Sequence, residues 1–196
     1  MNRSVDIGKA ITFFMEDEKW LEKLGIGTAL VLISSVLSVV LVGLVGFFIL
    51  AGYGIRLLQN VRDGNPRPLP EWNQWGEDLS SGFKLFVALF LYALPAFVFV
   101  IPIAIGVLIA NQSETAQMIG VPFIIGGYCL IILYSILLFL ATPGITIAFA
   151  RDEKIGSALQ LNAIWLWTQQ HLGTVLIVAL VNFAVSMVLG ILAPLL

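Results

Sequence analysis

The side chains that could perform catalysis are few and widely separated in this sequence. It contains one histidine, His171, and one cysteine, Cys129, and no group of His, Cys, Asp or Glu at the spacing of a metal site. It also lacks a glycine-rich phosphate-binding loop and the G-x-S-x-G turn of a nucleophilic serine. No charged residue falls well inside an apolar segment, where ion-coupled transporters usually carry one. We therefore predict that the protein is not an enzyme and uses no metal or other cofactor.

The residues that could bind a ligand are concentrated in one polar stretch, residues 52–83. Three arginines and two tryptophans in it form the first candidate site: Arg56, Arg62, Arg67, Trp72 and Trp75. Basic side chains near a membrane surface attract anionic lipid headgroups, at ~1 kcal/mol per residue. The same pattern also marks the cytoplasmic side of a membrane without binding any particular lipid. Both interpretations fit the sequence.

A second candidate group consists of polar residues in or beside apolar segments: Tyr53, Asn182 and Ser186. Asn182 lies midway along the last apolar segment, and Ser186 follows one helical turn later. Such side chains contact a solute or a lipid headgroup in some membrane proteins. More commonly they form hydrogen bonds between helices. Tyr53 could line a cavity or pack against neighbouring helices.

The elements that must position these residues are membrane-spanning helices. Of 196 residues, 59% are hydrophobic and 11% are charged, whereas a soluble globular domain carries about 25% charged residues. Four apolar runs exceed the length of ~18 residues that indicates a transmembrane helix. The net charge of -2 argues against nucleic-acid binding, which needs a basic surface. These features predict an all-α, polytopic membrane bundle that forms a single domain over residues 1–196.

Polar and apolar segments alternate along the chain. Residues 4–22 and 152–170 carry apolar side chains at helical spacing and predict amphipathic helices in the membrane interface. Residues 61–82 predict a cytoplasmic loop with a short interfacial helix from Pro70 to Ser81, because proline suits the first turn of a helix. Spanning helices are predicted over residues 83–110, 118–149 and 172–193.

Residues 24–60 present the main question of topology. As one helix, these 37 residues would extend ~55 Å, whereas the hydrocarbon core of a bilayer is ~30 Å thick. The segment therefore crosses twice as a helical hairpin, enters and leaves on one side as a re-entrant segment, or forms one long helix that projects from the bilayer.

The basic residues favour the hairpin. All ten lie in three groups: near the N-terminus, around the central loop and just after residue 150. A hairpin places all three groups in the cytoplasm, where basic residues accumulate. The five tryptophans lie beside the same groups, as interfacial aromatic residues do. We predict about five crossings of the cell membrane, with the N-terminus in the cytoplasm and the C-terminus outside.

A series of residues around the central loop resembles a known family. The series is Gly52-Tyr53-x-x-Arg56, then Gly64, then Leu69-Pro70-Glu71-Trp72-x-x-Trp75, then Gly82. It resembles the prokaryotic membrane-protein family called domain of unknown function 4013, and the resemblance extends over nearly the whole chain. It implies a helical fold embedded in a membrane, and it implies no activity.

Two functions fit these features. The first is a non-enzymatic membrane subunit or scaffold that binds lipid, partner membrane proteins or both. The second is a small transporter or lipid-handling protein that works as a homo-oligomer. The second is favoured by the prolines within apolar segments, which interrupt helices: Pro95, Pro102, Pro122 and Pro143. We prefer the first because the residues for catalysis or coupled transport are missing.

The hairpin can be tested by labelling single cysteines in intact cells and in inverted vesicles. In a Cys129→Ala background, a cysteine at Lys19 and one at Asn65 should both react only from the cytoplasmic side, because the hairpin returns the chain to the side on which it started. Labelling of the two positions from opposite sides would contradict the hairpin and invert every later loop.

Overall fold

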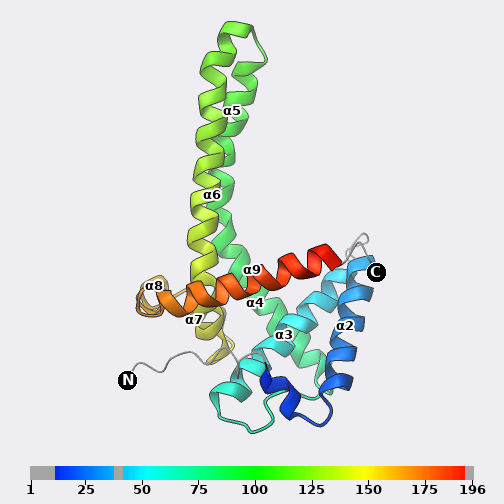
Figure 1. The fold of residues 1–196 in the computed structure, drawn as a ribbon. Helices are drawn as coiled ribbons and strands as arrows, with labels where there is room; N and C mark the ends of the chain where they lie inside the picture. Colours follow the sequence, from blue (N-terminus) through cyan, green and yellow to red (C-terminus); the bar gives the residue numbers. More distant parts are fainter. Residues whose placement is uncertain (1–11, 38–41, 193–196) are drawn as a thin grey trace. The chain divides into compact units, whose positions relative to one another are not determined.

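The computed structural model describes residues 12–37 and 42–192, without the side chains of residues 182–186 and 188–192. Within these ranges the chain is helical and contains no strand (Figure 1), which confirms the predicted fold class. A 3-10 helix, η1 (Phe13–Glu16), comes first. The α-helices are α2 (Trp20–Leu37), α3 (Gly43–Arg62), α4 (Trp75–Val98), α5 (Val100–Ala110), α6 (Glu114–Ala150), α7 (Ile155–Ala158), α8 (Leu161–Gln170) and α9 (Leu172–Leu192).

Several of these helices are long and apolar enough to cross a membrane. By length and composition, α2, α3, α4 together with α5, and α6 are four candidate spans. Helices α8 and α9, which are bent by 80° relative to each other, form a fifth if the pair is one span. Four to five candidates within the described residues agree with the prediction of about five crossings.

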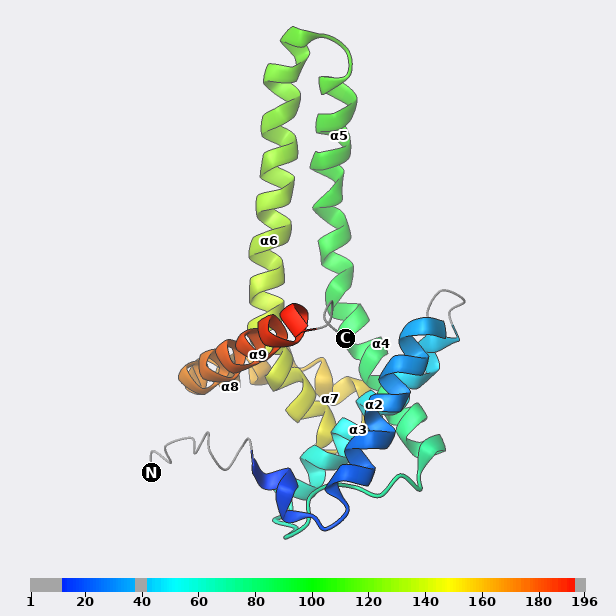
Figure 2. The same ribbon diagram turned by 45° about the vertical axis from the view of Figure 1, so that its right-hand side comes forward.

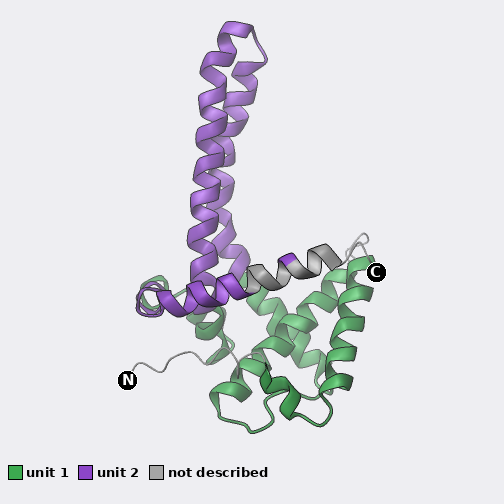
Figure 3. Ribbon diagram, in the orientation of Figure 1, with its two compact units in different colours: residues 1–88, 145–164 green, residues 89–144, 165–196 purple. Residues whose placement is uncertain are grey.

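The helices divide between two compact units (Figure 3). Unit 1 contains residues 1–88 and 145–164, and unit 2 contains residues 89–144 and 165–196. Helices α4, α6 and α8 each contribute residues to both units.

In unit 1, α2 and α3 lie side by side in opposite directions (Figures 1 and 2). Their contact is close at Gly46 of α3, where an added Cβ atom would collide with the Ser34 side chain of α2. Within the described residues 24–37 and 42–60, the chain therefore forms two antiparallel helices and not one continuous helix. That these two helices cross the bilayer twice stays a prediction.

Helix α3 ends at a glycine with a left-handed backbone conformation. Gly64 has a φ of 73°, which a residue without Cβ adopts at little cost. Its N–H donates to the carbonyl of Val61 at 3.2 Å, and the Asn65 N–H donates to that of Asn60 at 3.0 Å. This is the Schellman pattern that closes many helices. It turns the chain sharply after Arg62, toward the loop that precedes α4.

Helices α3 and α4 approach until their backbones touch. A Cβ atom on Gly52 would collide with the carbonyl oxygen of Asp78, and one on Gly82 would collide with that of Phe48. Beside this crossing, the Phe48 ring packs on the rings of Phe83 and Phe86 at centroid distances of 5.5 and 5.1 Å. The buried apolar side chains of unit 1 include Ile55, Leu85, Ala88, Ile145 and Phe149.

The start of α4 differs from the short helix predicted over Pro70 to Ser81. The helix begins at Trp75 and continues to Val98. The preceding residues are held by long-range hydrogen bonds, since the Pro70 carbonyl accepts from the Tyr53 hydroxyl and the Glu71 carbonyl accepts from Arg56. These carbonyls are consequently not used in a first helical turn, although proline alone would favour one.

Both predicted interfacial helices also differ in the structure. Residues 4–11 lie outside the described residues, and the remainder up to residue 22 is a 3-10 turn followed by the start of α2. Asp17 separates the two elements, because its extended backbone ends η1 and its carboxylate accepts the Lys19 N–H at 2.9 Å. Residues 152–170 contain α7 and α8, which are interrupted at Leu159 and Gln160.

Unit 2 contains a helical hairpin of α5 and α6 (Figures 1 and 2). A Cβ atom on Gly106 would lie 2.6 Å from the carbonyl oxygen of Gly120, so these two helices also meet at glycines. Pro102 lacks the N–H that would bond the Val98 carbonyl, which explains why α4 ends there and α5 begins two residues later. In contrast, α6 continues through Pro122 and Pro143.

The close crossing of α3 and α4 can be tested with two glycines of α3. Gly52→Ala should lower the thermal midpoint of the purified protein, by a destabilisation of about 1–3 kcal/mol, because the methyl group collides with the Asp78 carbonyl. Gly54→Ala is the matched control, since no atom lies within 4 Å of its added Cβ. The control should leave the midpoint unchanged or raise it. Equal effects of the two substitutions would exclude the crossing.

Candidate functional site

Arg56, the first of the predicted lipid-binding arginines, is fully engaged within unit 1. Its guanidinium donates to both oxygens of Asp78, from Nε to Oδ1 and from Nη2 to Oδ2, each at 2.6 Å. It also donates to Gln74 Oε1 at 2.9 Å and to the Glu71 carbonyl at 3.1 Å. Asp78 is only 1% exposed, and a buried carboxylate is stable when a bidentate cation satisfies it. Arg56 therefore joins α3 to α4 and to the loop before α4.

A second charged cluster surrounds Lys23, near the start of α2. Its ammonium lies 2.9 Å from Asp17 Oδ2 and 2.8 Å from Glu71 Oε1, and it donates to the Leu69 carbonyl at 3.0 Å. The hydrogen bond from Lys23 holds the pKa of the Asp17 carboxyl below its ordinary value of 3.8, although burial acts in the opposite direction. This carboxylate stabilises the folded protein above that ordinary value, and the contribution is lost as pH falls through the lower folded-state pKa.

Aromatic side chains connect the loop before α4 to α2 and to α3. The Trp72 ring stacks on Tyr53 at a centroid distance of 4.0 Å, and its Nε1–H donates to the Lys23 carbonyl at 2.9 Å. The Tyr53 hydroxyl donates to the Pro70 carbonyl at 3.1 Å. Trp75, which is 42% exposed, donates from Nε1 to the Trp72 carbonyl. Tyr53 thus contacts the loop, and it is not an isolated polar group within a span.

The two remaining predicted arginines lie apart from this network. Arg62 pairs with the adjacent Asp63 at 2.8 Å and also donates to the Ala150 carbonyl at 3.3 Å. Arg67 pairs with Glu18 at 2.8 Å. Both arginine side chains are about half exposed or more, so neither pair is expected to stabilise the fold strongly. The structure brings Arg56, Trp72, Trp75 and Tyr53 together, and it separates Arg62 and Arg67 from them.

A polar cavity of about 200 Å³ lies between α3, α4 and the residues after α6. Its lining consists of Arg56, Glu77, Asp78, Ser80, Ser81, Lys84 and Glu153. All of these residues belong to unit 1. Sequence analysis did not select the carboxylates or the serines of this lining. The available signal was the helical spacing of Asp78, Ser81 and Leu85, which indicates a common face of α4.

Glu153 is held firmly at one wall of the cavity. Its side chain accepts hydrogen bonds from Ser81 and from Gln59 Nε2, the latter at 3.0 Å. The bond from Ser81 holds the pKa of the Glu153 carboxyl below its ordinary value of 4.5, against the effect of burial, and Gln59 and the Lys84 charge assist it. Its backbone has a φ of 54°, a conformation that costs a non-glycine residue of order 1 kcal/mol or more. These contacts outweigh that cost.

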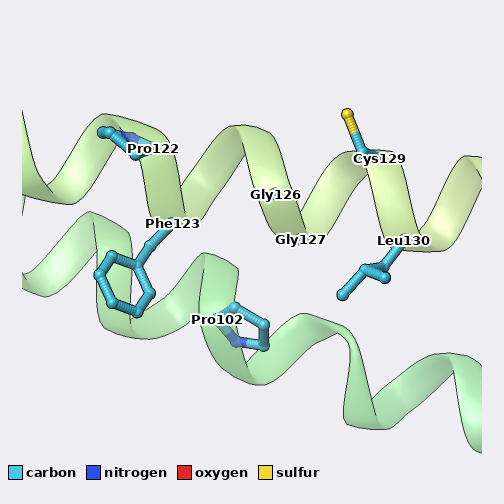
Figure 4. A pocket seen from close by; sticks show the side chains of 7 residues that line it. All are labelled: Pro102, Pro122, Phe123, Gly126, Gly127, Cys129 and Leu130. Carbon is cyan, nitrogen blue, oxygen red and sulfur yellow. The ribbon is translucent and has the colours of Figure 1, made fainter.

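Unit 2 carries an apolar groove of about 490 Å³ where α5 and α6 meet (Figure 4). Two glycines, Gly126 and Gly127, leave space on α6, while Phe123 and Leu130 extend toward α5. Cys129 also borders the groove and is exposed, but its sulfur points away from α5 (Figure 4). Apart from the Cys129 thiol, this lining consists of apolar side chains and glycines.

The remaining singled-out residues provide no catalytic arrangement within the described part of the chain. His171 stacks on Trp167 at 4.6 Å, and its Nδ1 lies 2.9 Å from the Trp167 carbonyl oxygen. No group of His, Cys, Asp or Glu among the described residues could hold a metal ion. The side chains of Asn182 and Ser186 lie outside the described residues, so their predicted polar contact stays a prediction.

A family model described as "protein of unknown function (DUF4013)" matches residues 22–196. The chain belongs to this family. The match confirms the resemblance seen in the residues around the central loop. No curated protein and no solved structure matches the chain.

The residues that carry the family resemblance are the residues that build this part of unit 1. Gly52 and Gly82 permit the helix crossing, and Gly64 ends α3. Arg56 donates to Asp78 of α4 and to the Glu71 carbonyl in the loop before it, and Trp72 of that loop stacks on Tyr53 of α3. The residues of the DUF4013 series in this chain therefore hold the second half of α3, the loop after it and the first turns of α4 together.

The buried pair can be tested against an exposed one. Asp78→Asn should destabilise the protein by about 3 kcal/mol or more, because it leaves the Arg56 charge partly buried without its partner. Asp63→Asn makes the same chemical change in the exposed pair with Arg62 and should leave the thermal midpoint unchanged. If both variants unfold at the wild-type midpoint, the ion pair of Arg56 and Asp78 does not stabilise the fold.

Proposed function

We propose that the protein is a non-enzymatic integral membrane scaffold, which binds lipid and partner membrane proteins and carries no catalytic site. The exposed apolar surface of α5 and α6 is the main support. From Leu85 to Ala150 the chain has a single charged residue, Glu114. Large apolar side chains are exposed along both helices, including Ile101, Leu108, Phe123, Leu133 and Phe139. Apolar surface of this extent marks contact with membrane or with other proteins.

The lengths of the helices in unit 2 support insertion in a bilayer. The part of α4 and α5 in this unit, residues 89–110, has 22 residues and would extend ~33 Å as a continuous helix. This length matches a hydrocarbon core of ~30 Å. The turn that joins α5 to α6 consists of Asn111, Gln112 and Ser113, and Glu114 begins α6; these polar residues suit the aqueous side of a membrane. The cell membrane and the orientation of the termini stay predictions.

The paired charges Lys23 and Arg56 of unit 1 support a structural role more than a catalytic one. Lys23 and Arg56 are both neutralised by carboxylates that the protein itself supplies. Such pairs position helix ends and a loop. The only histidine of the sequence has its Nδ1 at a backbone carbonyl and not at a nucleophile. We therefore keep the prediction that the protein is not an enzyme as part of this proposal.

A second candidate function is a small oligomeric transporter or lipid-handling protein. It is favoured by the groove between α5 and α6, which is lined by apolar residues and bordered by Pro102 and Pro122. A lipid chain fits a lining of this composition. The first proposal remains preferred because the one charged side chain in the sequence of unit 2, Glu114, stands at the first turn of α6 and not midway along a span, where it could couple or select a solute.

Native mass spectrometry of the protein extracted in polymer-bounded nanodiscs, without detergent, tests the proposal. We expect a complex that contains a second membrane protein in a fixed ratio together with lipid, because a scaffold must hold a partner to its exposed apolar surface. An unrelated membrane protein with the same tag, purified in parallel, is the control. A homo-oligomer of this chain alone supports the lipid-handling candidate, and a monomer without a fixed partner contradicts the scaffold.

A further inference from the structure

We propose that the polar cavity between α3, α4 and Glu153 is a binding site for a zwitterionic phosphoethanolamine group, presented by a membrane lipid. This inference deepens the proposed function and rests on it, because it names the lipid that the scaffold recognises. It moves the lipid contact from the arginines of the central loop to a face of α4.

The charges that remain without a partner define the ligand. Within the described residues, the side chains of Glu77, Ser80 and Lys84 make no hydrogen bond or close ion pair, although the Lys84 charge acts on Glu153 from a distance; all three line the cavity. They occupy one face of α4, because they follow each other at intervals of three and four residues. In contrast, Arg56 and Asp78 satisfy each other, and Glu153 is occupied by Ser81 and Gln59.

The charge balance of the lining selects a zwitterion over a simple anion. Two basic residues and three acidic residues line the cavity, so its formal charge is +2 - 3 = -1. A free phosphate would meet Lys84 but would be repelled by the carboxylates. A ligand that carries both an ammonium and a phosphate places the ammonium near Glu77 and the phosphate near Lys84 and Ser80. Each unpaired group then gains a partner of the right kind.

The volume limits the ligand to a small group. At about 200 Å³, the cavity is below the ~300–1,000 Å³ typical of sites for drug-sized ligands. A lipid headgroup can enter it while its acyl chains stay outside. A primary ammonium also donates three hydrogen bonds, as a lysine side chain does, and the methylated ammonium of choline donates none. The site should therefore prefer ethanolamine to choline.

The position of the cavity in the sequence points to a membrane lipid as the source. The cavity is lined by residues that lie at or near the ends of three long uncharged stretches of the sequence. Arg56 is the first charge after residues 24–55, and Lys84 is the last charge before residues 85–113. Glu153 follows shortly after the uncharged residues 115–150. Charges begin at the surface of the hydrocarbon core, so a cavity at three such boundaries lies at the depth of the headgroups.

Lipid titrations of the full chain in detergent, followed by native mass spectrometry, test the site. The probes are phosphatidylethanolamine, phosphatidylcholine and phosphatidylglycerol with identical acyl chains. We expect wild-type protein to bind the ethanolamine lipid at least about fivefold more tightly than the other two. Lys84→Gln and Glu77→Gln should each remove this preference, while Lys84→Arg, which keeps the charge, should retain it.

Two control variants each remove one charge, one positive and one negative, outside the cavity. Arg67→Gln and Glu18→Gln remove one charge each from an exposed pair outside the cavity and should leave the preference intact. Equal binding of the three lipids to wild-type protein, or equal losses in the control variants, would overturn the site. Thermal midpoints of all variants should match wild type, because the substituted cavity residues make no contact that the fold needs.

A soluble competitor distinguishes the source of the ligand. O-phosphoethanolamine should displace the ethanolamine lipid only at high concentration if the lipid is the natural ligand. Tight binding of the soluble compound without any lipid preference would overturn the lipid assignment. A protein that loses headgroup preference and still extracts with a fixed partner would refute this inference alone. A protein without a partner but with the preference would refute the scaffold alone.

Discussion

The contact on which unit 1 depends is the crossing of α3 and α4 at Gly52 and Gly82. Because neither residue has a side chain, the backbone of each helix reaches the carbonyl oxygen of the other. This approach brings the Asp78 carboxylate to the Arg56 guanidinium in a buried position. Burial of either charge alone would cost several kcal/mol, so the two must meet. The remaining donors of Arg56 then bind Gln74 and the Glu71 carbonyl, and they shape the loop before α4.

This dependence explains how far sequence reasoning reaches. The all-helical membrane fold and the family follow from apolar runs and from the residue series around the loop. The role of Arg56 cannot be predicted in this way, because its partner Asp78 lies 22 residues away in the sequence. The two side chains meet only because α3 and α4 cross closely at Gly52 and Gly82. A basic residue beside tryptophans has the same sequence pattern whether it binds lipid or a buried carboxylate. The helix start predicted at Pro70 is also not observed. Tyr53 and Arg56 donate to the carbonyls of Pro70 and Glu71, which the first turn of such a helix would use.

The two units are stabilised by different interactions. In unit 1, charged side chains and aromatic rings join helices to a loop. In unit 2, α5 and α6 meet at glycine contacts, and the Tyr134 hydroxyl of α6 donates to the Tyr92 carbonyl of α4 at 2.5 Å. This division fits a membrane protein, because lipid tails remove the hydrophobic drive that joins helices in water. Close packing and internal hydrogen bonds must then supply the attraction between spanning helices.

The distribution of paired and unpaired charges leads to a general criterion for a binding site in such a protein. A charge that is buried must be neutralised by the fold itself, as Lys23 is by Asp17 and Glu71. A charge that has already been neutralised has few donors or acceptors left for a ligand. The most prominent arginine of the sequence is therefore a poor candidate for lipid recognition, because all its nitrogens are engaged. We expect recognition at Glu77 and Lys84, whose charges border a cavity and have no close ion-pair partner among the described residues.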